Sequence, residues 1–134
     1  MGNIKKVFLG GTCNGSTWRD KLIPMLKKEY FNPVVEDWTP ECQEEERRQK
    51  EFVCDAQTYV ITPKMLGVFS IAEVVDASNK NPQKTIFCVL ENDEGEVFSK
   101  ASLKSLNAVK DMVSFNGAHV LSSIEDLATF INNN

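Results

Sequence analysis

Apolar runs of strand length alternate along this chain with segments whose side chains recur at helical spacing. The runs predict strands at residues 5–9, 33–36, 59–62, 84–91 and 118–121. The helical spacing predicts helices over 17–30, 41–51, from 70 onward, over 103–115 and over 122–131. This alternation of strands and helices predicts a parallel sheet with helices on both faces, because the right-handed connections between parallel strands permit few other arrangements. We expect one α/β domain over residues 1–134, a flavodoxin-like (Rossmann-like) three-layer sandwich with five parallel strands in the order 2-1-3-4-5.

Local signals mark where several of these elements begin and end. Three pairs of residues have the spacing of a capping box at a helix N-terminus: Thr17 with Asp20, Ser70 with Glu73, and Ser122 with Glu125. Residues 93–96 predict a turn, and the asparagines at 132–134 predict a frayed tail.

Composition narrows the class of protein without naming a function. The chain has 134 residues, of which 42% are hydrophobic, and a net charge of −4. These values exclude disordered and fibrous classes and argue against a basic groove for a nucleic-acid polymer. No apolar run approaches the roughly 20 residues of a membrane span, and the N-terminus lacks a signal segment. We therefore expect a cytoplasmic protein that binds no membrane.

The cysteines give no metal-binding pattern. Cys13, Cys42, Cys54 and Cys88 form no CxxC pair, and His119 is the single histidine available to help them. We expect reduced thiols, with Cys88 in the core, and neither a metal nor another cofactor.

Four loops are expected where such a sheet binds ligands, beyond the carboxyl ends of its strands. They are residues 10–16, 37–40, 63–70 and 92–95. The glycines of the first loop would let backbone amides approach an anion, with the following helix dipole assisting. A tight strand-to-helix turn explains the same glycines equally well.

Glu73 is the sharpest chemical signal in these loops. It stands in the expected first turn of a helix and has apolar neighbours. A carboxylate near a helix N-terminus is stabilised as an anion, which suits a nucleophile or a partner for an oxocarbenium centre. A capping box with Ser70 explains the same residue, and spacing alone favours the cap.

Several short motifs occur in a recognisable order. They are VFLGGT at 7–12, STWR at 16–19, the helix that carries Glu51, the strand that carries Tyr59, and SIAEV at 70–74. This succession, over residues 4 to about 90, resembles the nucleoside 2-deoxyribosyltransferase-like family. The resemblance implies a flavodoxin-like fold, a homo-oligomer, and a glutamate that attacks the anomeric carbon of a 2-deoxynucleoside while the N-glycosidic bond breaks.

The resemblance also implies roles for individual positions. Glu73 corresponds to the glutamate nucleophile, and Trp38 is a candidate to stack on a base. Trp18 is expected in the core. The expected substrate-binding positions are Gly10, Gly11, Thr12, Asp37, Trp38, Glu51, Gly67 and Ser70.

Two positions depart from the family pattern. Gly67 stands six residues before Glu73, where better-characterised members have an aspartate that holds a sugar hydroxyl, and Thr58 or Tyr59 replaces another aspartate. We expect N-glycosidic bond cleavage or 2-deoxyribosyl transfer on a small-molecule nucleoside or nucleotide. Two alternatives stay open: an NAD glycohydrolase with the same glutamate, and a nucleotide-binding or sequestering module without turnover.

Overall fold

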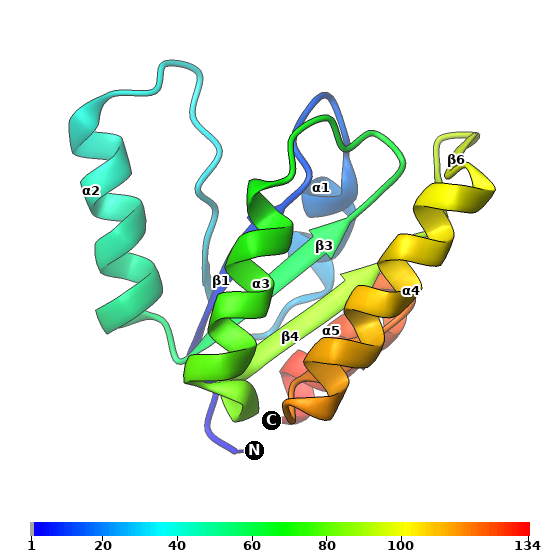
Figure 1. The fold of residues 1–134 in the computed structure, drawn as a ribbon. Coiled ribbons are helices and arrows are strands. Elements are labelled where there is room, and N and C mark those ends of the chain that lie inside the picture. The colour runs from blue at the N-terminus through cyan, green and yellow to red at the C-terminus, as the bar shows by residue number, and fades with distance from the viewer. Residues whose placement is uncertain (1) are drawn as a thin grey trace.

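A five-stranded parallel sheet forms the centre of the protein (Figure 1). The computed structural model describes residues 2–134. The strands are β1 (Lys6–Gly11), β2 (Glu29–Phe31), β3 (Ala56–Ile61), β4 (Thr85–Val89) and β7 (His119–Leu121). Their order in the sheet is β2-β1-β3-β4-β7, and every neighbouring pair is parallel. The predicted α/β sandwich with strand order 2-1-3-4-5 is therefore confirmed.

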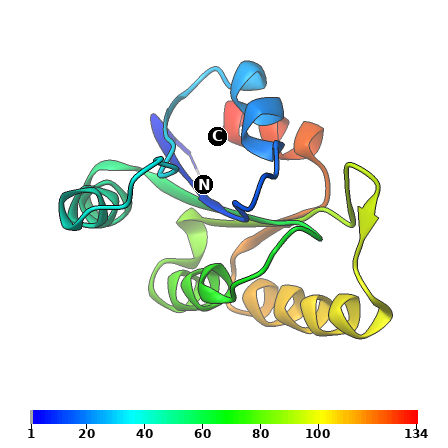
Figure 2. The ribbon, with the colours of Figure 1, turned by 90° about the horizontal axis from the view of Figure 1, so that it is seen from above.

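Five α-helices accompany the sheet, and one of them stands apart. They are α1 (Trp18–Leu22), α2 (Pro40–Arg48), α3 (Phe69–Lys80), α4 (Lys100–Phe115) and α5 (Ile124–Asn133). The short turns are η1 (Ile23–Met25), η2 (Gln49–Val53, a π-helix) and η3 (Pro82–Lys84). Seen from above, α3 and α4 cover one face, α1 and α5 cover the other, and α2 lies beyond both layers (Figure 2).

Alternating side chains of the strands build one core on each face of the sheet. On β3, Tyr59 and Ile61 pack on the α3 and α4 side, whereas Val60 packs on the α1 and α5 side. Cys88 is fully buried and Trp18 is 1% exposed, which confirms that both belong to the core. The core on the α3 and α4 side, which includes Val74 and Ala77, packs α3 against β3, and this helix carries Glu73.

The second strand does not lie where the sequence pattern predicted it. Residues 33–36 are irregular, and β2 instead pairs Glu29 to Phe31 with the first half of β1. The helix expected over 17–30 stops early because Pro24 lacks the N–H that would continue it. Pro33 likewise has no N–H to extend the pairing of β2.

None of the three predicted capping boxes forms as predicted. Thr17 makes no capping bond, and its hydroxyl donates to Oε1 of Glu94 at 3.2 Å instead. Helix α3 begins one residue before Ser70, with Val68 at its N-cap and no side-chain cap. Glu73 therefore lies in the second turn rather than the first.

At the third predicted cap, Ser123 rather than Ser122 caps α5, accepting from the amide of Asp126.

The chain ends are held, so the predicted frayed tail is wrong. Oδ1 of Asn132 accepts from the amide of Lys27 at 2.7 Å, and the carbonyl of Asn134 accepts from the amide of Ile4 at 2.8 Å. Both termini consequently lie close together (Figure 1). The predicted turn at 93–96 is confirmed as part of a hairpin between β5 (Asn92–Asp93) and β6 (Glu96–Val97).

No helix within residues 2–134 is long and apolar enough to cross a membrane.

A buried hydroxyl on β3 provides a test of the packing. Within residues 2–134, Oγ1 of Thr58 is buried and has no hydrogen-bond partner. Because such a group loses its bond to water on folding, Thr58→Val should raise the unfolding free energy by about 1 kcal/mol. Urea denaturation of the variant and of wild type measures this difference.

Thr62→Val is the matched control, since the hydroxyl of Thr62 donates to Asp93 at 2.6 Å and its loss should be destabilising. A Thr58→Val protein that is less stable than wild type would contradict the assignment.

Candidate active-site cleft between helices α2 and α3

Three adjoining hollows form a cleft between α2 and α3, which we name the α2–α3 cleft. Their volumes are about 280, 400 and 570 Å³. The first hollow lies at the carboxyl end of β1, against Gly10, Gly11 and Ser70. The middle one lies between Trp38 and Phe69, and the largest contains Glu73. Because neighbouring hollows share lining residues, an extended ligand can reach from the first to the third.

Glu73 and Lys50 form an ion pair inside the largest hollow. Nζ of Lys50 lies 3.0 Å from Oε2 of Glu73, and the two side chains are 22% and 10% exposed. Such shielding leaves the pair less screened by salt than a surface pair. Since the dipole effect of a helix falls off beyond its first turn, the charged partner of the Glu73 carboxylate is the Lys50 ammonium rather than the helix N-terminus.

The floor of the cleft requires glycine at two positions. A Cβ on Gly10 would lie 2.8 Å from the ring of Tyr59, and a Cβ on Gly11 would lie 2.0 Å from the carbonyl oxygen of Val60. Gly11 also has φ of 126°, which disfavours residues with a side chain. Packing therefore accounts for both glycines.

Buried side chains of α1 hold the loop that follows β1. The Arg19 guanidinium donates to the carbonyls of Leu9 (3.0 Å), Thr12 (2.8 Å) and Gly11 (3.4 Å), and the Trp18 indole also donates to Thr12 at 2.8 Å. Burial lowers the pKa of Arg19, while the nearby Cys13 opposes this shift. The side chain of Thr12 faces inward and accepts from the amide of Thr62 at 3.0 Å. Of the alternatives for this loop, the geometry favours the tight turn over an anion cradle.

Glu46 is a second carboxylate of the cleft. It lies on α2, where it lines the first and middle hollows. Burial raises the pKa of Glu46, and the negative charge of Glu73 raises it further, against the opposing effect of Lys50. Glu46 is therefore the carboxylate of the cleft whose surroundings favour the protonated form, as is typical of the acid in an acid–base site.

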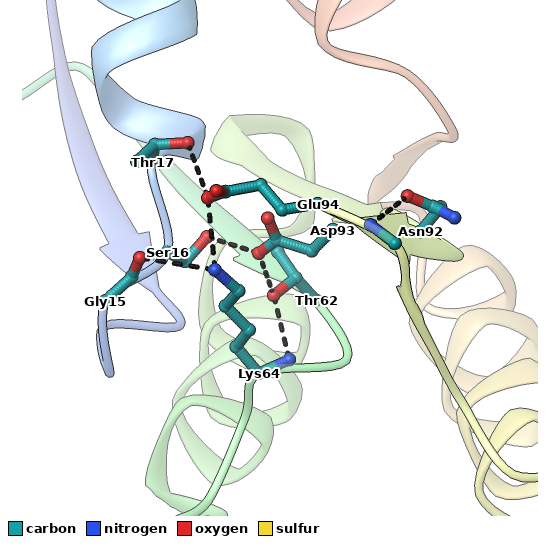
Figure 3. A network of polar contacts seen from close by, with 9 residues as sticks. Gly15, Ser16, Thr17, Thr62, Lys64, Asn92, Asp93 and Glu94 are labelled. Atoms are coloured by element: carbon teal, nitrogen blue, oxygen red, sulfur yellow. Dashed lines mark hydrogen bonds and ion pairs between the residues drawn. The ribbon is translucent and has the colours of Figure 1, made fainter.

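A polar network on the far side of the β1 loop ties three loops together (Figure 3). Asp93, which is 5% exposed, accepts from the hydroxyls of Ser16 and Thr62, each at 2.6 Å. Glu94 accepts from Lys64 at 3.0 Å and from Thr17 at 3.2 Å. The network thus anchors the β3–α3 loop, which leads into the helix that carries Glu73.

The structure brings together some of the sequence-predicted site residues and separates others. Six of the predicted positions line the α2–α3 cleft: Gly10, Gly11, Trp38, Glu51, Ser70 and Glu73. Three lie outside its hollows: Thr12, which is buried in the loop contacts, and Asp37 and Gly67, which are exposed. A Cβ on Gly67 would meet nothing within 4 Å, so the site leaves open space at the position where relatives are expected to carry a carboxylate.

Sequence reasoning missed Glu46 and Lys50. The segment 41–51 reads as an exposed charged helix, from which Glu51 was the expected site residue. In the structure the side chain of Glu51 is 44% exposed and pairs with Arg47 at 3.6 Å. The available signal was the spacing of Glu46, Gln49 and Lys50, which places them on one helical face.

Among residues 2–134, no group of three or more His, Cys, Asp and Glu side chains is placed to hold a metal ion. The fold and the cleft together define an α/β protein whose adjoining hollows each contain a carboxylate, Glu46 in the middle one and Glu73 in the largest. The model of the family described as nucleoside 2-deoxyribosyltransferase like matches residues 4–92, which is more than half of the chain. The chain therefore belongs to the nucleoside 2-deoxyribosyltransferase-like family. Searches of curated proteins and of solved structures gave no significant match.

The loop network predicts a pH dependence of stability. Burial alone would raise the pKa of Asp93, but the hydrogen bonds from Ser16 and Thr62 and the charge of Lys64 outweigh it and lower that pKa. A pKa below the unfolded value of about 3.9 means that the unfolded chain binds the proton first. The stabilisation should be complete above pH of about 4 and should disappear as pH falls through the folded pKa.

Asp93→Asn should flatten this acid dependence and cost about 1–3 kcal/mol near pH 7, because the hydroxyls lose a charged acceptor. Denaturation curves between pH 2.5 and 7, roughly the range that spans carboxyl titration, measure both effects. Glu94→Gln is the control, since its side chain is 48% exposed and its pairing should contribute little. An unchanged pH profile in Asp93→Asn would contradict the role given to the network.

Proposed function

We propose that this protein cleaves the N-glycosidic bond of a nucleoside or nucleotide, or transfers its 2-deoxyribosyl group, with Glu73 as the nucleophile. The observation that supports this most is the placement of the Glu73 carboxylate. It is 10% exposed, lies in a hollow of about 570 Å³, and forms an ion pair with Lys50. A carboxylate in such surroundings can attack an electrophilic carbon that enters the hollow.

The reaction proceeds in two displacements. In the first, a carboxylate oxygen of Glu73 attacks the anomeric carbon, the bond from that carbon to the base nitrogen breaks, and the base leaves with the electron pair. The departing base takes a proton from Glu46, whose raised pKa keeps it protonated at higher pH than an ordinary glutamate. In the second, water or another base attacks the same carbon and releases the Glu73 carboxylate.

Two aromatic side chains offer a place for the base. Trp38 and Phe69 line the same hollow of about 400 Å³ and are 55% and 72% exposed. Exposed rings of this kind can stack on a planar heterocycle. Because both rings lie in the hollow next to that of Glu73, a base placed there directs its sugar toward the carboxylate.

The nucleophile is tested by removing its charge. Wild type should release free base from at least one compound in a pool of nucleosides, nucleotides and NAD, and Glu73→Gln should lose this activity, by about 10⁴-fold or more for a residue on which covalent catalysis depends. Liquid chromatography of the pool identifies the compound that disappears and the base that forms. A folded wild-type protein that releases no base, nicotinamide included, would refute the proposal.

The role of Glu46 as the acid is tested by the pH dependence of kcat/KM. If protonated Glu46 supplies the proton, kcat/KM should fall as pH rises through its raised pKa. Glu46→Gln should lower kcat/KM by about 10²–10⁴-fold and remove this alkaline limb. Glu41→Gln, on the same helix but outside the three hollows, gives the same change of charge as a control. An alkaline limb that persists in Glu46→Gln would assign the proton to another group.

The open space at Gly67 favours a second candidate function. Without a carboxylate at this position the site lacks the group expected to hold a sugar hydroxyl, which suits a nucleotide-binding or sequestering module. Isothermal titration calorimetry that detects tight nucleotide binding by wild type without product would support this module over the enzyme.

A further inference from the structure

Lys50 reaches Glu73 from the wall of the α2–α3 cleft opposite α3. Of the two oxygens of the Glu73 carboxylate, its Nζ contacts Oε2, at 3.0 Å. Two nearby cations have other partners. Arg47 of α2 pairs with Glu51, and Lys80 of α3 pairs with Asp76 at 2.9 Å. Within residues 2–134, Lys50 is therefore the cation in ion-pair contact with Glu73, and Oε1 is the oxygen left to face a ligand.

The backbone of Lys50 is held by an unusual turn. Lys50 lies on the π-helix η2, where the amide of Cys54 donates to the carbonyl of Gln49 five residues back, at 2.8 Å. Gln49 is 6% exposed and bonds to Glu45 at 2.9 Å, which anchors the start of this turn. π-Helical turns occur often at functional sites because they displace a side chain from its regular helical position.

Two side chains of β3, those of Gln57 and Tyr59, hold the backbone of Lys50 through hydrogen bonds. Nε2 of Gln57 donates to the backbone carbonyl of Lys50 at 3.2 Å, and the hydroxyl of Tyr59 donates to Oε1 of Gln57 at 2.7 Å. Tyr59 is fully buried in the core beside α3. The backbone of Lys50 is thus held against the sheet, and its ammonium is held by the ion pair with Glu73.

We propose that Lys50 is a positioning residue for Glu73. This inference rests on the proposed function. By holding Oε2, the ammonium leaves Oε1 free to form the bond to the anomeric carbon. When water later attacks that carbon, the bond from carbon to the glutamate oxygen breaks and its electron pair returns to the carboxylate. The water proton goes to the deprotonated Glu46, and Lys50 stays an ammonium that stabilises the returning charge.

The experiment compares Lys50→Met and Lys50→Arg with wild type and with Lys104→Met, a control that removes an exposed lysine on α4 that lines none of the three hollows. Base release gives kcat and KM, and intact-mass spectrometry after acid quenching detects sugar bound to Glu73. Lys50→Met should lose about 10²-fold in kcat, as when one donor to a developing charge is removed, with no rise in KM. Because return of the carboxylate is slowed most, the sugar–enzyme ester should accumulate.

Lys50→Arg should recover part of kcat, and Lys104→Met should match wild type. Circular dichroism reports folding, and Lys50→Gln, which keeps a donor without charge, replaces the Met variant if that one fails to fold. A wild-type kcat in the folded Lys50 variants, or a loss confined to KM, would overturn the positioning role while leaving the proposed function intact. Absence of base release by wild type would overturn both.

Discussion

The close approach of β1 and β3 at Gly11 is the constraint on which the cleft depends. At that point a side chain would lie 2.0 Å from the backbone oxygen of Val60, so the chain must pass with glycine and with a positive φ. The strand then turns sharply, and three of its carbonyls are directed away from any sheet partner. Buried carbonyls need hydrogen bonds, and Arg19 provides them.

This use of Arg19 explains the STWR motif in physical terms. An isolated buried guanidinium loses its hydration, but bonds from a charged donor stabilise more than neutral ones do. The Trp18 ring, 4.3 Å from the guanidinium carbon, adds a cation–π contact. The motif therefore shapes the loop, and Arg19 also lines the first hollow of the cleft together with Gly10 and Gly11.

The sequence allowed the sheet to be predicted because buried parallel strands give continuous apolar runs, as in 84–91. It did not locate β2, since an edge strand such as Glu29–Phe31 has few buried residues, while the apolar pair Val34 and Val35 lies in an irregular segment and is about half exposed. The family resemblance led to Glu73. Lys50 was not found in this way: its spacing from Glu46 indicates a shared helical face, but no residue pattern marks the π-helical turn on which it lies.

Helix α2 shows why the cleft and the stability of its wall are linked. No residue of α2 is fully buried, so hydrophobic packing contributes little to holding it, and its position depends on its ends. At the N-terminus Thr39 caps the helix, and at the C-terminus the π-helix η2 ties it to β3 through Gln57. The ion pair between Lys50 and Glu73 then links η2, and with it the C-terminal end of α2, to α3. The contacts that set the width of the cleft are therefore the same contacts that orient the carboxylate within it.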